Sequence, residues 1–326
     1  MCMKRWMRLL ALLLILPLLA GAEMIEEEVL LEPVGAEGFP PLNAEGFLDE
    51  GEFVSEDNDL GIWRYASQVL RVEVIRKSSE KPKLIWYEAE IWAKEGVFFH
   101  ALAFDPAHRW NKLEYPYKIA RKYQTVLAVN CDFAHLRIQQ NARPGFLMRE
   151  GQVERDRTWK KNSKHFPNLD TLAIFPDGDM RVFWSGEKSR EDYVEMGAVD
   201  VLAFGPYLIR DGEMNPAVKR YGASHAQRTG VGMMEKGHYA AVMIEGRHKG
   251  SRGASVAELA AIMRDMGCTV AFNLDGGQSS AMIFMGKQLS FIPNKYGRNA
   301  SARKAAEILG IGTSEQTAVE GEKMGY

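Results

Sequence analysis

The residues best suited to chemistry in this chain lie together in one short segment. In order they are Asn273, Leu274, Asp275, Gly276, Gly277, Gln278, Ser279 and Ser280. The apolar run 269–272 precedes them and predicts a buried strand, so the acid follows a strand end. The glycines allow a sharp turn and close approach to a bound group, and the carboxylate can serve as base or nucleophile. A tight β-turn that begins with Asp is the alternative interpretation.

Other polar residues also fall where predicted strands begin or end. They are Asn130 and Asp132 after the run 125–129, Arg228 before an apolar run, Glu245 and Arg247 after 239–244, and Arg252. Glu258 lies in a predicted helix, 255–266, at the capping-box position opposite Ser255. A guanidinium is the natural bidentate partner of a phosphate. Taken singly, each residue also has a structural explanation: a surface ion pair for Arg228, a solvated acid for Glu245, a helix cap for Glu258.

The elements that must position these residues are mainly strands. Alternating apolar residues predict strands, turn residues predict hairpins at Glu150-Gly151, Asp177-Gly178 and Asp211-Gly212, and helices are few. The pattern predicts an α+β domain with a mixed β-sheet core, in which one strand–helix–strand unit carries the site.

The N-terminus predicts export. Three basic residues precede the apolar run 9–20, and Ala20-Gly21-Ala22 is a cleavage site, so residues 1–22 are predicted to be a signal peptide. The apolar run is too short to span a bilayer comfortably. We expect a secreted or periplasmic protein that is not integral to the membrane after cleavage; an uncleaved anchor is the alternative.

Charge is distributed unevenly behind the signal peptide. Residues 23–60 hold ten Glu, three Asp and no Lys or Arg, which predicts an acidic, disordered leader. Residues 61–326 carry a net charge of +8. We expect the domain at 61–313, followed by a flexible tail at 314–326. A basic domain suits an anionic substrate, although scattered surface lysines that maintain solubility explain the charge equally well. We expect no nucleic-acid partner.

Two cysteines remain after cleavage, Cys131 and Cys268. Their places beside predicted strands put the thiols at opposite ends of a sheet if the strands run parallel. We therefore do not expect a disulfide, which requires Cα atoms within about 7 Å. Neither cysteine has the spacing of a zinc site.

Taken in order, these segments resemble the phosphodiester glycosidase family over roughly residues 95–312. The matching positions are Asn130 to Phe133, Arg228-Thr229, Glu245 to Arg247, Arg252-Gly253, Glu258 to Ala260, 273–280 and a closing Arg303. Three positions depart from the family pattern. Gln278 stands in place of a third Gly, a change that narrows the pocket or alters its contacts. Cys131 replaces a small Gly, and Glu245 stands where an Asp is frequent.

The resemblance implies hydrolysis of the glycosidic bond of a sugar-1-phosphodiester, with an N-acetylglucosamine-like sugar or an envelope polysaccharide or exopolysaccharide as substrate. It implies Asp275 as the catalytic carboxylate, with Glu258 or Glu245 as its partner. The residues implied to bind phosphate or sugar are Arg228, Arg247, Arg252, Asn130, Asp132, Asn273, Gly276, Gly277, Ser279 and Ser280.

No cofactor is required by this chemistry. A divalent cation between Asp132 and Asp275 is an alternative that the sequence does not favour, because it shows no dedicated ligand cluster. Two further functions stay open. One is a non-catalytic protein that binds or assembles polysaccharide, which the Gln278 change favours. The other is a phosphodiesterase that cleaves P–O instead of C–O.

Overall fold

The computed structural model describes residues 37–108, 112–131, 133, 145–156, 169–220 and 224–318. The chain divides into two units, Met1–Glu32 and Pro33–Tyr326, and all the described residues belong to the second. The predicted signal peptide, 1–22, and Asp132 lie outside the described residues. No helix in the described ranges is long and apolar enough to cross a membrane.

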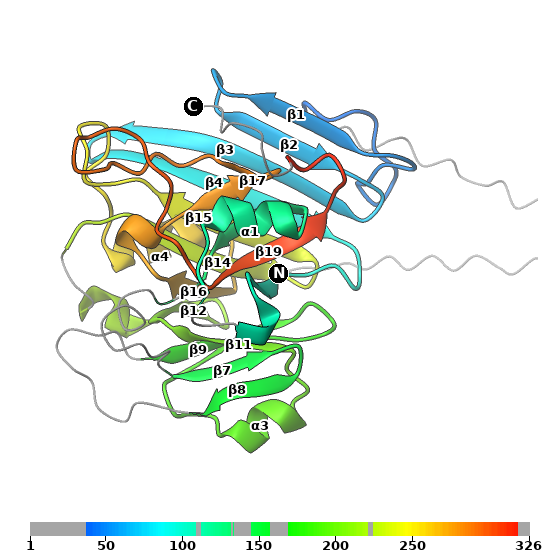
Figure 1. Cartoon of the computed structure of the whole chain (residues 1–326), viewed down its shortest axis with the longest axis vertical. Helices are drawn as coiled ribbons and strands as arrows, with labels where there is room; N and C mark the ends of the chain where they lie inside the picture. Colours follow the sequence, from blue (N-terminus) through cyan, green and yellow to red (C-terminus); the bar gives the residue numbers. More distant parts are fainter. Residues whose placement is uncertain are drawn as a thin grey trace, which may run out of the picture. The chain divides into compact units, whose positions relative to one another are not determined.

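A nine-stranded sheet forms the largest element (Figure 1), in the order β1-β2-β3-β4-β15-β14-β16-β12-β13. Its strands are β1 (Phe53–Asp57), β2 (Ile62–Ala66), β3 (Leu70–Glu80), β4 (Lys83–Ala93), β12 (Tyr207–Arg210), β13 (Glu213–Met214), β14 (Arg228–Glu235), β15 (His238–Ile244) and β16 (Val270–Leu274). All of its pairings are antiparallel.

Two five-stranded antiparallel sheets accompany it, in the orders β18-β17-β6-β19-β5 and β10-β9-β11-β7-β8. The first contains β5 (His100–Ala103), β6 (Thr125–Asn130), β17 (Met282–Phe284), β18 (Lys287–Gln288) and β19 (Glu307–Thr313). The second contains β7 (Phe146–Arg149), β8 (Gln152–Asp156), β9 (Asp170–Ile174), β10 (Met180–Phe183) and β11 (Asp200–Phe204). The helices are α1 (Pro116–Lys122), α3 (Arg190–Glu195) and α4 (Val256–Asp265), with 3₁₀ turns η1 (Pro106–His108), η2 (Pro216–Arg220) and η3 (Gly277–Ser279).

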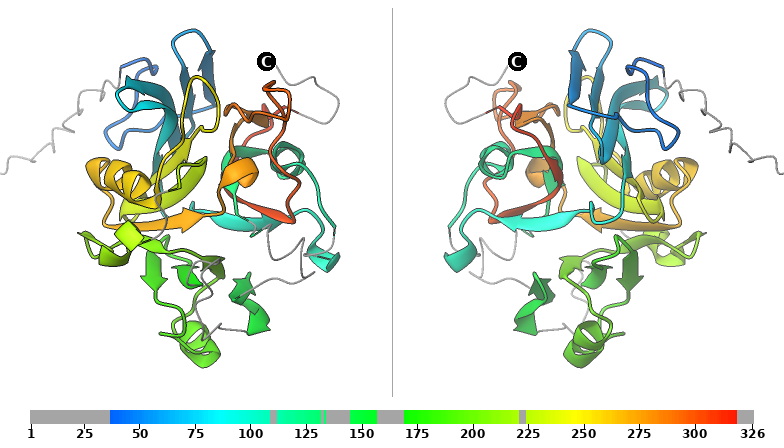
Figure 2. Two further views of the ribbon diagram at one scale, coloured as in Figure 1. Left: turned by 90° about the vertical axis from the view of Figure 1, so that its left-hand side faces the viewer. Right: turned by 90° about the vertical axis from the view of Figure 1, so that its right-hand side faces the viewer.

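The three sheets enclose one central core. Strand β15 shows how: Tyr239, Ala241 and Met243 face this core, and the alternate residues face α4 on the other side of the sheet. Helix α1 covers the outer face of the β5–β6–β19 sheet, and α3 covers that of the β7–β11 sheet. Figure 2 shows α4 and α1 on opposite sides of the layered sheets. The predicted α+β class is confirmed: strands dominate and helices are few.

Helix α4 links β15 to β16. Its packing helps to position the ends of these two strands, where the candidate site lies. Ser255 caps it, with the reciprocal capping box to Glu258 that the sequence predicts. Gly230 and Gly232 of β14 lie beneath it, where a Cβ atom at Gly232 would stand 2.9 Å from the Met263 methyl. The glycines therefore let the helix approach the sheet closely.

The expected leader is wrong over its second part, residues 37–60. Strand β1 pairs with β2 along its whole length, and Leu42 and Phe47 are buried. Acidic composition predicted disorder, but the apolar side chains among the acids bury enough surface to fold. The expected tail is also ordered at its start, because Thr317 is buried and donates a hydrogen bond to the Gln124 carbonyl. The predicted domain therefore extends at least over residues 37–318.

Candidate active site

Strand register brings three of the predicted site residues together at the ends of neighbouring strands in the nine-stranded sheet. Arg228, the first residue of β14, pairs with Ile244 of β15, and Thr229 pairs with Leu274 of β16. Since β14 is antiparallel to both neighbours, its beginning lies beside their ends. Arg228, Arg247 and Asp275 therefore converge.

A cavity of about 550 Å³ lies at this convergence. Its walls comprise Phe204, Ser224, Ala226, Gln227, Arg228, Arg247, Asp275, Gly276, Gly277, Gln278, Pro293, Asn294, Lys295 and Arg303. Four of these described lining residues are cationic and one, Asp275, is a carboxylate. The cavity therefore has an excess of positive charge that suits a phosphate-bearing ligand.

The turn that presents Asp275 depends on its two glycines. A Cβ atom at Gly276 would stand 2.8 Å from the Gln227 carbonyl oxygen, and Gly277 has a left-handed φ of 64°. The Gly277 amide donates to the same carbonyl at 3.0 Å. The Gly276 amide donates to Asp275 Oδ1, also at 3.0 Å. The carboxylate is thus presented on a turn held against the β14 end.

The Arg228 guanidinium is held beside the cavity by two hydrogen bonds to the backbone. Its Nε donates to the Ala254 carbonyl at 3.0 Å and its Nη2 to the Ser224 carbonyl at 2.9 Å. Nη1 lies 3.4 Å from where a Cβ atom at Gly276 would be. Burial lowers the pKa of the Arg228 guanidinium, Arg247 lowers it further, and Asp275 acts in the opposite direction. The guanidinium stays protonated, and a bound anion would relieve the repulsion between the two arginines.

Arg247 follows β15 in an unusual backbone conformation. Its φ of 62° is left-handed, although it is not a glycine. Its Nη1 lies 3.8 Å from where a Cβ atom at Gly277 would be. Arg228 and Arg247 thus flank the Asp275 turn, as the strand ends predict.

Asn130 supports this turn from below. Its Nδ2 donates to the Asp275 carbonyl at 2.8 Å, and its Oδ1 accepts from Thr229 Oγ1 and the Ala281 amide. The side chain is buried. The structure therefore gives Asn130 a role in holding the Asp275 turn; the expected contact with sugar or phosphate stays a prediction.

The expected partner acids lie outside the cavity. Glu258 accepts from the Ser255 amide at 2.8 Å and pairs with Arg252. Burial raises the pKa of Glu258, but hydrogen bonds from Ser255 and Arg252 outweigh it and hold the pKa below its ordinary value. Glu258 and Arg252 thus form an ion pair that caps α4, and neither belongs to the cavity wall.

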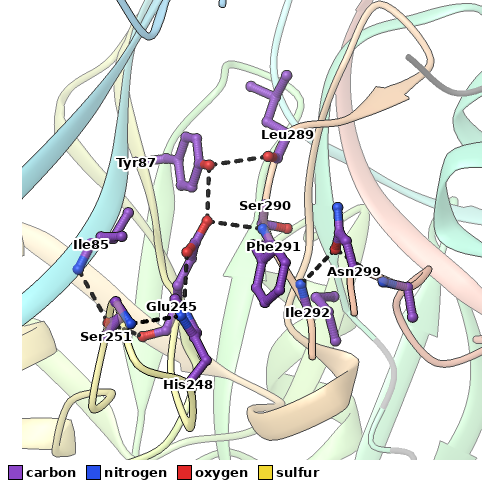
Figure 3. A network of polar contacts seen from close by, with 12 residues as sticks. Ile85, Tyr87, Glu245, His248, Ser251, Leu289, Ser290, Phe291, Ile292 and Asn299 are labelled. Atoms are coloured by element: carbon purple, nitrogen blue, oxygen red, sulfur yellow. Dashed lines mark hydrogen bonds and ion pairs between the residues drawn. The ribbon is translucent and has the colours of Figure 1, made fainter. Parts of the chain in front are cut away.

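Glu245 faces a second, larger cavity of about 1010 Å³. Figure 3 shows its carboxylate between Tyr87, Phe291 and His248. It is nearly inaccessible, with 2% of its surface exposed. Glu245 is therefore not a wall of the Asp275 cavity.

The remaining predicted residues are mostly buried beside the cavity. Asn273 donates from Nδ2 to the Gly205 carbonyl at 2.8 Å. Ser279 and Ser280 are buried, and their hydroxyls have no hydrogen-bond partner in the described part of the chain. Neither hydroxyl lines the cavity.

Comparisons with known proteins identify the family of this chain. The phosphodiester glycosidase family model matches residues 123–312, more than half of the chain. The chain belongs to the phosphodiester glycosidase family. The matched residues include both arginines, the Asp275 turn and Arg303.

Individual relatives are distant. The uncharacterized SPbeta prophage-derived protein YomE of Bacillus subtilis (strain 168) is 23% identical over 240 residues, 73% of this chain and 35% of that protein. The match thus spans about a third of that relative's length. The zebrafish N-acetylglucosamine-1-phosphodiester alpha-N-acetylglucosaminidase catalytic domain, auto-inhibited by its pro-peptide, gives a TM-score of 0.59 at 18% identity, covering 80% of this chain and 87% of that one. A hypothetical protein from Synechocystis gives 0.51 at 14%, covering 75% and 62%. These structures show the shared fold.

Several wall residues of this family member were not among the predicted site residues. Gln227 directly precedes Arg228, and Asn294 and Lys295 come from a loop after β18. Arg303 was noted only as a closing motif residue; its amide donates to the Gln278 carbonyl at 2.7 Å. The signal for Gln227 was its position beside a site arginine, whereas nothing in the sequence marks Lys295.

Two further predictions concern metals and cysteines. In the described ranges no group of three or more His, Cys, Asp or Glu could hold a metal ion. Cys131 and Cys268 lie in or beside different sheets and are not joined by a disulfide.

Proposed function

We propose that this protein hydrolyses the glycosidic bond of a sugar-1-phosphodiester in the Asp275 cavity. The observation that carries the proposal is the convergence of Arg228 and Arg247 on the Asp275-Gly276-Gly277 turn. Lys295 and Arg303 line the same cavity. Family membership supports the same class of substrate.

The chemistry of the leaving group explains why the cavity has more cationic than anionic residues. A departing phosphomonoester is a weak base, so it requires less protonation than an alcohol would. Its developing charge is stabilised by fixed positive groups in a partly enclosed cavity. The arginines meet this demand, and the ionised, paired state of Glu258 fits a reaction that requires no second acid.

Asp275 serves the anomeric carbon in this proposal, as nucleophile or as base for a water molecule. It is the carboxylate among the described cavity residues. No cofactor takes part. Attack by Asp275 itself would lead to retention, and activation of a water molecule would lead to inversion.

Export and substrate identity complete the proposal. The predicted signal peptide would deliver the protein to the periplasm or the exterior. Its substrate there would be an N-acetylglucosamine-like phosphodiester or a phosphodiester of envelope polysaccharide or exopolysaccharide. The four cations of the cavity favour a phosphate-bearing ligand over neutral glycans.

The proposal is tested with a panel of sugar-1-phosphodiesters and Asp275→Asn. The wild type should release a phosphomonoester from at least one of them. Asp275→Asn should lower kcat by roughly 10²–10⁴-fold and leave Tm nearly unchanged. Asp265→Asn, an exposed carboxylate at the end of α4, is the control and should retain full turnover. Turnover of Asp275→Asn within about threefold of wild type would refute the role of Asp275.

A further inference from the structure

Glu245 connects two segments that both line the Asp275 cavity, although it faces away from that cavity. The first segment is the Arg247 loop, residues 245–251. The second is residues 291–295, of which Pro293, Asn294 and Lys295 line the same cavity. Figure 3 shows the Glu245 side chain between them.

The Arg247 loop is closed by contacts of its own residues. Ser251 Oγ donates to the Glu245 carbonyl at 2.7 Å, and the backbones of His248 and Ser251 exchange two hydrogen bonds. Glu245 Oε2 contacts His248 Nε2 at 3.1 Å. Gly246 leaves no room for a side chain, because a Cβ atom there would stand 2.7 Å from the Gly253 Cα. These contacts lie on both sides of Arg247, whose backbone is left-handed.

The second segment is bound by the other carboxylate oxygen. The Phe291 amide donates to Glu245 Oε1 at 2.9 Å, as does the Tyr87 hydroxyl. The Leu289 carbonyl lies 3.0 Å from the same hydroxyl, so the single Tyr87 proton is shared between the two acceptors. Burial raises the pKa of Tyr87, and the Glu245 charge raises it further, so the hydroxyl keeps its proton. The Glu245 carboxylate thus fixes the backbone at Phe291, where the chain that follows β18 turns toward the Asp275 cavity.

This arrangement requires two acceptor oxygens. The Gly250 amide donates to His248 Nδ1 at 3.1 Å, so this pattern assigns the proton to Nε2, which donates to Glu245. The Phe291 amide is necessarily a donor too. A glutamine has one oxygen and one NH₂ group, so it could accept one of these donors but would oppose the other.

We propose that Glu245 is a positioning residue: it holds Arg247 and residues 291–295 in the arrangement that binds the phosphate of the substrate. This inference rests on the proposed function, because it assigns the anion that Arg247 contacts. It also explains why an acid follows β15 without lining the cavity.

The test measures binding of inorganic phosphate by calorimetry, which needs no turnover. The proteins compared are wild type, Glu245→Gln, Arg247→Ala and the double variant. Glu245→Gln should weaken phosphate binding on the order of tenfold, the loss of about one charge-assisted bond. In the Arg247→Ala background the same change should have a clearly smaller effect, because Arg247 is gone and only the positioning of residues 291–295 remains to be lost.

Glu56→Gln is the matched control. Glu56 lines the same second cavity and pairs with Lys287 at 3.0 Å, so the substitution removes the same charge from the same space. Its phosphate affinity should equal that of wild type. If Glu245→Gln does not fold, His248→Ala removes one of the three contacts and should show the same dependence on Arg247, with a smaller loss.

Three results would overturn the inference. They are wild-type phosphate affinity in Glu245→Gln, equal losses with and without Arg247, and no phosphate binding by wild type. The proposed function fails separately: a protein that shows the predicted coupling but hydrolyses no sugar phosphodiester would leave Glu245 as a positioning residue of an anion site.

Discussion

Arg228→Lys separates recognition of phosphate from recognition of sugar. Two of the three guanidinium nitrogens are committed to backbone carbonyls, those of Ala254 and Ser224, so Nη1 is the donor directed toward the cavity. A lysine ammonium cannot reach both carbonyls and the ligand together, since its donors radiate from one atom. The substitution keeps the charge but loses the fixed direction of the donor.

The expected cost follows from that single donor. One hydrogen bond to a charged group contributes about 1.5–3 kcal/mol. This corresponds to a loss of kcat/KM of roughly 10–150-fold. The loss should appear with a phosphodiester and be much smaller with an uncharged aryl glycoside of the same sugar, so the ratio of the two losses isolates the phosphate contribution.

The assay is steady-state kinetics on both substrates, with thermal unfolding to confirm the fold. Arg264→Lys, an exposed arginine on α4, is the control and should change neither rate. Equal losses on the two substrates would contradict the reasoning, because they would mean that Arg228 only maintains the shape of the pocket.

Two further predictions concern stability. A variant that begins at residue 61 lacks β1, Leu42 and Phe47, and its Tm should fall by about 10 °C or more relative to one that begins at residue 37; equal Tm values would show that residues 37–60 are dispensable. Burial raises the pKa of Asp170 to about 6, despite hydrogen bonds from the Tyr207 and Ser185 amides. The Asp170 carboxyl therefore binds its proton more tightly in the folded protein than in the unfolded chain. The free energy of unfolding that this contributes is present at pH 4 and is lost as the pH rises through about 6. The Tm of wild type relative to Asp170→Asn should decline between pH 4 and 7, and a constant difference would contradict the shift.

Much of the fold was predictable because local patterns dominate in this chain. Alternation along β3 and β4, the turn residues of the β7–β8 and β9–β10 hairpins, and the capping box of α4 each appear where the sequence predicts them. The expectation of disorder at residues 37–60 is wrong because it rested on net charge, whereas apolar side chains such as Leu42 and Phe47 are buried in the folded domain.

The site was predictable only as far as strand ends determine it. Arg228 and Asp275 follow directly from the pairing of β14 with β16. Sequence could not tell which way an acid faces after a strand: Glu245 is turned from the cavity by Tyr87, 158 positions away in the chain. For Asn130, the sequence likewise could not show its long-range hydrogen bonds to Asp275, Thr229 and Ala281.

The central claim is that the bond broken is the glycosidic C1–O bond. Hydrolysis of a sugar-1-phosphodiester in ¹⁸O-labelled water tests it most directly, with mass spectrometry of both products. If Asp275 delivers water or itself to the anomeric carbon, the label should appear in the sugar and the phosphomonoester should remain unlabelled. Label in the phosphate would contradict this account and would assign the cavity to a phosphodiesterase that cleaves P–O.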